Sequence, residues 1–156
     1  IMQDILTCAM GLDVHRDIIV ACLVKGAVDA EPEAETRTFS TLIPEMQKLR
    51  DWVIESECRN IAMESTGIYW QPIYEMLESC FDGEISILVV NARHMKNVPG
   101  RKTDMKDAQW IATLLRAGLL KGSFIPDKAF RELRHLTRYR KSVVHDITAQ
   151  KNRIDK

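Results

Sequence analysis

The sequence predicts an α/β fold on one mixed sheet, with three leading antiparallel strands, flanking helices and a long C-terminal helix. Apolar, β-branched runs with a short polar break open the chain, and helical and strand patterns alternate after them. Residues 127–156 then carry a single apolar stripe at helical spacing. With 156 residues, 46% of them hydrophobic, the chain is long enough for one globular domain with a core.

The leading strands are predicted from the segment ILTCAMGLDVHRDIIVACLVKG, residues 5–26. Its two apolar runs are separated by a turn near His15–Asp17. After a polar, proline-containing connection, residues 36–40 (TRTFS) predict a third strand. Residues 41–57 then place apolar side chains at helical spacing, with Pro44 in the first turn, and predict a helix.

The middle of the chain alternates between strand patterns and helix patterns. In order, we expect a strand at 59–65, a helix at 66–80, a buried strand at 84–90 and a loop at 91–102. Thr103 is expected to cap a helix from Asp104 to Ala117, which Gly118 closes. Three strands followed by helix, strand, helix, strand, helix is the order of the ribonuclease H-like fold. A doubly wound Rossmann sheet would place a helix after the first strand, where this sequence has a hairpin.

The C-terminal stretch lacks Gly and Pro from residue 127 onward. Its apolar residues recur at spacings of three and four, which predicts a long amphipathic helix. They are Phe130, Leu133, Leu136, Val143, Val144, Ile147 and Ile154. We interpret this helix as the start of a coiled-coil or linker region whose partner is another subunit or a further part of the protein. The predicted domains are therefore 1–126 and 127–156.

The net charge of zero hides a strong asymmetry along the chain. Residues 1–90 hold 6 Lys and Arg against 16 Asp and Glu, whereas residues 91–156 hold 16 against 6. A basic half favours a polyanionic partner on one face. The alternative is that the two halves neutralise each other in the fold.

Four carboxylates are the candidate catalytic and metal-binding residues. Asp13 and Glu64 lie at the ends of the first and fourth predicted strands, which are neighbours in a ribonuclease H-like sheet. Asp104 and Asp107 are three residues apart in GRKTDMKDAQW, residues 100–110, and we expect them on one face of a helix beside those strand ends. Hard divalent cations prefer oxygen ligands, and paired ions promote phosphodiester cleavage. Each carboxylate alone has a plainer interpretation as a turn or helix-cap residue.

Basic residues surround this acidic set, and we predict that they bind nucleic acid phosphates. Those near the acidic pair are Arg93, Lys96, Arg101, Lys102 and Lys106, and those on the terminal helix are Arg131, Arg134, Arg138 and Arg140. The four cysteines, at 8, 22, 58 and 80, form no CxxC pair, so we interpret them as free thiols in a reducing cytoplasm. No apolar run approaches the roughly 20 residues of a membrane span.

The chain also resembles a known family. GLDVHRD, AMESTGIYW, VNARHMKNVPGRKTDMKDAQWIA and RELRHLTRYRKS together resemble the N-terminal, RuvC-like part of DEDD-type transposases of the insertion-sequence-110 family, which includes site-specific DNA invertases. The resemblance runs over nearly the whole chain, and the KTDxKDA block is specific in that context. The four acidic letters of the family name fall on Asp13, Glu64, Asp104 and Asp107.

The resemblance implies the fold of RuvC-type Holliday-junction resolvases and a magnesium cofactor, for which manganese substitutes. It implies a cytoplasmic bacterial enzyme that cleaves and transfers DNA strands in transposition and site-specific recombination. Implied partners are DNA, a structured guide RNA in some members, and further copies of the chain through the C-terminal helix. Full-length members carry a C-terminal domain with a serine nucleophile, so the chain is expected to be a fragment that is incomplete as a recombinase.

Two other functions stay open at this point. One is a stand-alone Holliday-junction resolvase-like nuclease, and the other is a non-catalytic module for nucleic-acid binding or oligomerisation. A sugar-kinase-like ATPase shares the early strand order, but it needs a Gly- and Thr-rich phosphate turn after Asp13, where VHRD follows instead.

Overall fold

The computed structural model describes residues 5–64, 67–102, 105–122, 125 and 128–154. It shows one five-stranded mixed sheet with the strand order β3-β2-β1-β4-β5. The strands are β1 (Cys8–Val14), β2 (Ile18–Lys25), β3 (Glu33–Ser40), β4 (Asn60–Glu64) and β5 (Ser86–Val90). Strands β1, β2 and β3 pair antiparallel, while β1–β4 and β4–β5 pair parallel. The predicted fold class, with three antiparallel strands followed by parallel ones, is confirmed.

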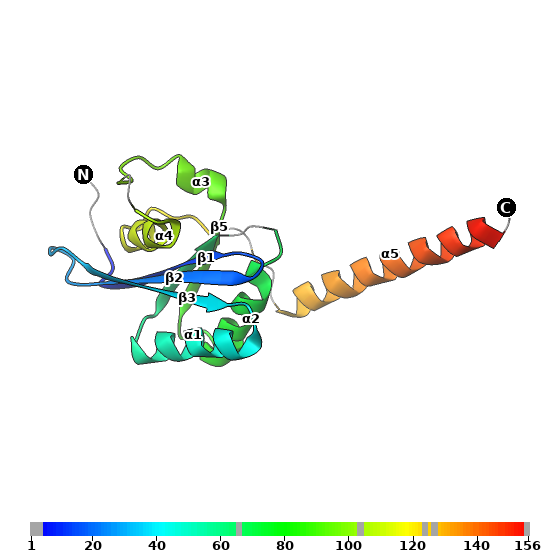
Figure 1. Cartoon of the computed structure of the whole chain (residues 1–156), viewed down its shortest axis with the longest axis horizontal. Helices are drawn as coiled ribbons and strands as arrows, with labels where there is room; N and C mark the ends of the chain where they lie inside the picture. The colour runs from blue at the N-terminus through cyan, green and yellow to red at the C-terminus, as the bar shows by residue number, and fades with distance from the viewer. Residues whose placement is uncertain (1–4, 65–66, 103–104, 123–124, 126–127, 155–156) are drawn as a thin grey trace. The chain divides into compact units, whose positions relative to one another are not determined.

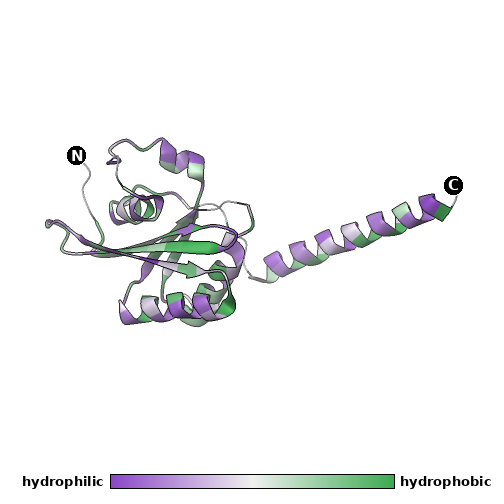
Figure 2. Ribbon diagram, viewed as in Figure 1, coloured by the Kyte–Doolittle hydropathy of each residue, from purple (hydrophilic) through white to green (hydrophobic). Residues whose placement is uncertain are grey.

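Helices cover both faces of the sheet. They are α1 (Ile43–Glu55), α2 (Trp70–Phe81), α3 (Ala92–Lys96) and α4 (Asp107–Arg116), and α5 (Lys128–Ile154) follows them. In Figure 1, α3 and α4 lie on one side of the sheet, and α1 and α2 lie on the other. The green strands and mostly purple helix surfaces of Figure 2 show that hydrophobic residues concentrate in the sheet between these two layers.

The alternation of side chains along β1 assigns each residue to one layer. Ala9 packs with Trp110 and Ile111 of α4 in one hydrophobic cluster, so the odd-numbered residues of β1 face α4. The even-numbered residues, such as Met10 and Leu12, are fully buried against the opposite layer. Asp13 is odd-numbered and therefore belongs to the α4 face.

Gly11 is the point at which α4 comes closest to the sheet. A Cβ atom built on Gly11 would lie 2.6 Å from the backbone nitrogen of Ala112 and closer still to the carbonyl oxygen of Ala108. Both atoms belong to the backbone of α4, which cannot move aside as a side chain can. The missing side chain at Gly11 therefore allows α4 to pack directly on β1.

Arg116 fixes the other end of α4. Its side chain is 1% exposed. Its Nε donates to the carbonyl oxygen of Leu6 at 2.9 Å, and its Nη2 donates to those of Gly26 and Ala27 at 3.0 and 2.7 Å. These charge-assisted hydrogen bonds tie the last turn of α4 to the segments that flank β1 and β2.

Several element boundaries differ from the prediction. The predicted loop at 91–102 contains the short helix α3, whose first turn is capped by the Asn91 side chain accepting from the backbone N–H of Arg93 at 2.9 Å. The helix predicted from Thr66 begins at Trp70, and Gly67 has a left-handed φ of 59° that a helix excludes.

The helix predicted from Asp104 begins at Asp107, with Lys106 as its N-cap. The carbonyl of Met105, which in a longer helix would accept from the N–H of Gln109, accepts instead from the guanidinium of Arg101 at 2.7 Å. The predicted cap Thr103 and the candidate ligand Asp104 lie outside the described residues.

The chain divides into two compact units, Ile1–Ser123 and Phe124–Lys156. The second unit consists mainly of α5, whose hydrophobic residues recur among hydrophilic ones along its length (Figure 2). Among the described residues, no helix is both long and apolar enough to span a membrane. All four cysteines are free, with Cys22 and Cys58 buried.

The close approach at Gly11 yields a testable prediction. Gly11→Ala should lower the free energy of unfolding by about 3 kcal/mol, because the added methyl group overpacks a backbone-to-backbone contact. Chemical denaturation followed by circular dichroism measures the change. In the control Gly122→Ala, the added Cβ would meet the flexible end of Leu88 at 3.0 Å, and we expect a much smaller loss. Equal losses in the two variants would contradict the close-packing account.

Candidate active site

Strands β1 and β4 bring Asp13 and Glu64 together. These strands pair in parallel with Leu12 opposite Met63, so the next residues along, Asp13 and Glu64, stand level with each other. Neighbouring strands lie about 4.8 Å apart, and level residues of a parallel pair point to the same face. Both carboxylates therefore lie at the carboxyl end of the sheet on the side that α4 covers. The predicted neighbourhood of the two strand ends is supported by this register.

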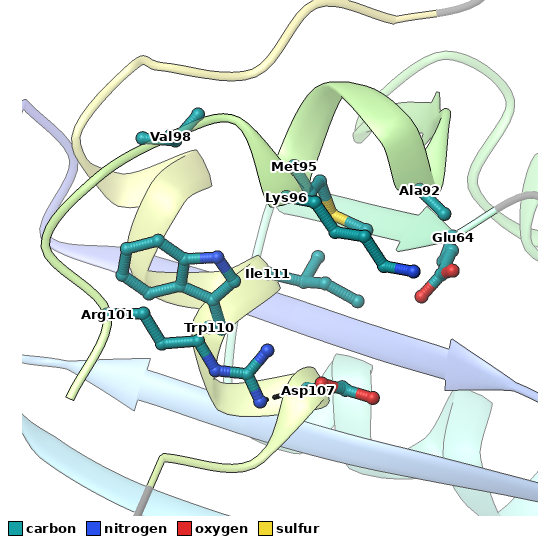
Figure 3. Close-up of a pocket in the computed structure, with 9 residues that line it drawn as sticks. All are labelled: Glu64, Ala92, Met95, Lys96, Val98, Arg101, Asp107, Trp110 and Ile111. Carbon is teal, nitrogen blue, oxygen red and sulfur yellow. Dashed lines mark hydrogen bonds and ion pairs between the residues drawn. The ribbon is translucent and has the colours of Figure 1, made fainter. Parts of the chain in front are cut away.

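Helix α4 brings the third carboxylate. Asp107 is the first residue of α4, where its negative charge is favoured by the helix dipole. Figure 3 shows Asp107 and Glu64 on the walls of one cavity of about 290 Å³. The other lining residues are Ala92, Met95, Lys96, Val98, Arg101, Trp110 and Ile111. The cavity thus lies between the end of β4, helix α3 and the start of α4.

The charges of the other two carboxylates act on Glu64. Burial is the largest cause that raises the pKa of the Glu64 carboxyl, and the negative charges of Asp13 and Asp107 raise it further. Because charge–charge effects fade over about 10 Å at ordinary ionic strength, these groups share one neighbourhood. Lys96 and His15 act in the opposite direction and lower the pKa of Glu64.

Cationic groups from the same chain contact two of these carboxylates. Arg101 Nη2 donates to Asp107 Oδ1 at 2.7 Å, and this ion pair is drawn as a dashed line in Figure 3. His15 Nε2 lies 3.0 Å from Asp13 Oδ2. The side chain of Lys96 extends from α3 toward Glu64 across the cavity (Figure 3).

The oxygen donors of Asp13, Glu64 and Asp107 suit a hard divalent cation such as magnesium, because such ions select carboxylate oxygen and water. Their negative charges favour a cation at this site, and a bound cation would relieve their repulsion. In the part of the chain that the structure describes, no group of three or more His, Cys, Asp or Glu side chains is placed to hold one metal ion. The residues present fit the metal by donor chemistry, with two of them engaged by His15 and Arg101.

The predicted phosphate-binding residues do not all lie in one place. Lys96 and Arg101 line the cavity beside the carboxylates. Lys102 lines a different pocket, of about 310 Å³, between α4 and the β2–β3 connection. Arg93 lies on α3 and Lys106 caps α4, and both are exposed. The predicted residues Arg131, Arg134, Arg138 and Arg140 all belong to α5, which is in the second unit.

Two features of the site were not predicted from the sequence. Trp110 and Met95 form apolar walls of the cavity, and Trp110 follows Asp107 by three residues on the same helix, which was an available signal. The contact between His15 and Asp13 was also missed. A spacing of two residues across a strand end carries no regular signal for such a contact.

Comparison with known proteins identifies the family. Residues 10–156 match the sequence profile of the insertion-sequence-110 DEDD family, whose members are described as transposases. The chain belongs to this family of DEDD transposases. No curated protein matches it.

Solved structures similar to this transposase chain are resolvases. RuvC from Thermus thermophilus aligns with a TM-score of 0.51 and 12% identity, over 74% of this chain and 99% of RuvC. The structure of T. thermophilus RuvC in complex with a Holliday junction substrate aligns with a TM-score of 0.51 and 11% identity, over 76% and 100%. A fowlpox virus resolvase in complex with its Holliday junction DNA has a TM-score of 0.48 and 8% identity, over 70% and 96%. The RuvC structures confirm the ribonuclease H-like fold, and the family supports a nucleic-acid-cleaving function in DNA recombination.

The raised pKa of Glu64 predicts how stability depends on pH. The folded transposase chain holds a proton on Glu64 over a pH range in which the unfolded chain has lost it, so ionising Glu64 costs stability as pH rises through that range. Without divalent metal, Glu64→Gln should therefore unfold at a higher temperature than the wild type at pH 7. The difference should vanish below the ordinary glutamate pKa of about 4.3.

Thermal unfolding at a series of pH values measures this difference. Glu75→Gln, which removes an exposed carboxyl of α2, is the control for the loss of one negative charge. A Glu64→Gln variant that is less stable than the wild type at pH 7, or that matches the control at every pH, would contradict the account.

Proposed function

We propose that this chain is the Mg²⁺-dependent catalytic domain of the transposase and that it cleaves DNA strands during transposition and site-specific recombination. The observation that carries the proposal is the joint placement of three carboxylates. Asp13 and Glu64 stand level on adjacent parallel strands, and the charge of Asp107 on α4 acts on Glu64. In the proposal, Asp104, outside the described residues, completes the set of four.

The proposed roles follow from the positions of these residues. Asp13, Glu64, Asp104 and Asp107 hold magnesium, or manganese in its place, at the scissile phosphate. When bound, a pair of such ions lowers the pKa of an attacking water and stabilises the leaving oxygen. Trp110 and Ile111 form the apolar side of the cavity and limit access of bulk water to the carboxylates. Lys96 offsets the negative charge near Glu64.

Nucleic acid is the proposed partner of the basic residues. Lys96 and Arg101 line the cavity, and Arg93, Lys102 and Lys106 are exposed on neighbouring segments. In the proposal, all five contact phosphates of the nucleic acid that leads to the carboxylates. In the second unit, α5 carries the other proposed phosphate contacts, Arg131, Arg134, Arg138 and Arg140, of which Arg131 is buried and the other three are exposed. The same phosphate chemistry serves DNA and a structured guide RNA. The Holliday junction DNA bound by RuvC supports DNA as the first choice.

A second copy of the chain is the proposed partner of α5, so that residues 1–126 form the catalytic domain and 127–156 the association helix. Leu133, Leu136, Tyr139, Val143 and Ile147 are all more than a third exposed and recur every three or four residues, the spacing of a coiled-coil seam. Sedimentation equilibrium measures the association. A monomer at the highest concentration reached would contradict it.

A stand-alone Holliday-junction resolvase is the second candidate. Its support is that nearly the full length of RuvC, 99%, aligns within 74% of this chain. Cleavage of a four-way DNA junction by this chain without any further domain would favour the resolvase. Cleavage only when the chain is joined to the remainder of a transposase would favour the first proposal.

The catalytic proposal predicts the effect of substitutions in the chain joined to the remainder of the transposase. Asp13→Asn and Glu64→Gln should each lower metal-dependent DNA cleavage by at least about 100-fold, because each removes a metal ligand. DNA affinity, measured by fluorescence anisotropy, should stay unchanged or increase, since a negative charge near phosphate is lost. Asp17→Asn, at an exposed carboxyl 85% accessible in the β1–β2 turn, is the matched control. Full cleavage by either ligand variant would overturn the assignment.

The phosphate contacts predict a change in the salt dependence of binding. Replacing Arg93 and Lys102 with Ala should reduce the slope of log affinity against log salt by about 1 to 2 units, because each phosphate contact on duplex DNA contributes about 0.9. Anisotropy titrations between 50 and 200 mM salt, the range over which such slopes are about linear, measure it. The control removes Lys48 and Arg50 of α1, on the opposite face of the sheet (Figure 1). Equal slopes for the two double variants would show that Arg93 and Lys102 do not contact the nucleic acid.

A further inference from the structure

Arg101 stands where a metal ion would approach Asp107. Its Nη2 donates to Asp107 Oδ1 at 2.7 Å and to the carbonyl oxygen of Met105 at 2.7 Å, and its Nε donates to the same carbonyl at 3.2 Å. The guanidinium thus bridges a candidate metal ligand and the backbone just before α4. It also lines the cavity that contains Glu64 (Figure 3).

The ion pair between Arg101 and Asp107 is exchangeable. The side chain of Arg101 is 41% exposed and that of Asp107 is 55% exposed. An ion pair with this much exposure to water shifts an equilibrium only a few-fold. A divalent cation carries twice the charge and is attracted by Asp13 and Glu64 as well, so it can displace a single guanidinium from Asp107.

We propose that Arg101 is a placeholder cation, which holds Asp107 in the metal-free protein and gives up this carboxylate when a divalent metal binds. The released guanidinium then becomes available to a DNA phosphate, for which its forked donors are well suited. This inference rests on the proposed function, because it assumes that Asp107 is a metal ligand. It makes Arg101 a positioning residue that links metal binding to DNA binding.

Thermodynamic linkage between metal binding and DNA binding predicts how loss of Arg101 changes each affinity. If Arg101 and the metal compete for Asp107, loss of Arg101 strengthens metal binding. If the metal frees Arg101 for phosphate, metal must also strengthen DNA binding, and this strengthening must be smaller when Arg101 is absent. A fixed structural role for Arg101 would instead lower stability and leave the metal affinity unchanged.

Mn²⁺ titrations followed by the electron paramagnetic resonance of the free ion test the competition directly. Arg101→Ala should bind Mn²⁺ about two- to fivefold more tightly than the wild type, because the metal no longer has to break an exposed ion pair that stabilises the metal-free state by about this factor. Arg101→Gln, which keeps a donor for the Met105 carbonyl, should show the same gain and serves if the alanine variant folds poorly. The control is Arg16→Ala, which removes an arginine 78% exposed in the turn after Asp13 and paired with Asp17. Equal affinities for the Arg101 and Arg16 variants would overturn the proposal.

The wild-type chain provides a second readout that needs no substitution. The Nε–H signal of Arg101 in a nitrogen–proton NMR spectrum should shift as Mg²⁺ is added, with the same midpoint as metal binding. A signal that stays in place while the metal binds would overturn the placeholder role.

Failure of this inference is distinguishable from failure of the proposed function. If Asp107→Asn weakens Mn²⁺ binding but Arg101→Ala does not strengthen it, Asp107 is a metal ligand and Arg101 is not a placeholder. If Asp107→Asn leaves the Mn²⁺ affinity unchanged, Asp107 is not a metal ligand, and the placeholder role of Arg101 is also wrong.

Discussion

The contact between the backbone of α4 and Gly11 is the constraint on which the arrangement of the site depends. Because Gly11 has no side chain, the backbone of α4 at Ala108 and Ala112 lies directly on β1. With the helix held there and its last turn tied down by Arg116, its first residue, Asp107, points into the cavity that Glu64 also lines. The absence of a side chain at Gly11, in the middle of β1, thus fixes the position of Asp107 at the start of α4.

Charge is the second constraint, and it opposes the first. Packing buries Glu64, which is the main reason that its pKa is raised, and the negative charges of Asp13 and Asp107 raise this pKa further. Nitrogen groups of the same chain contact two of these carboxylates, the His15 imidazole at 3.0 Å and the Arg101 guanidinium at 2.7 Å. If the proposed metal site is correct, metal binding there exchanges one cation for another, and metal affinity and phosphate affinity are linked properties.

The local patterns of the sequence predicted the sheet well, because alternation along β1 and the hairpin after it depend on nearby residues. The meeting of Asp13 and Glu64 was predictable for the same reason, since both stand at the ends of strands that the element order makes neighbours. The start of α4 was not, because a side-chain contact from Arg101 to the Met105 carbonyl decides it. Helix α3 was missed because its five residues are too few to show a helical period, although Asn91 was a visible cap. The pairing of Arg101 with Asp107, six residues apart, follows no helical spacing and depends on the fold of the connecting loop.

The central claim is that the carboxylates at the end of the sheet share divalent metal. Anomalous scattering from crystals of the chain soaked in Mn²⁺ tests it most directly. The account predicts one or two peaks within about 2.0 to 2.6 Å of carboxylate oxygens, with Asp13, Glu64 and Asp107 among the ligands. Peaks confined to other carboxylates, or an ion bound by Asp107 without Asp13 and Glu64, would contradict it.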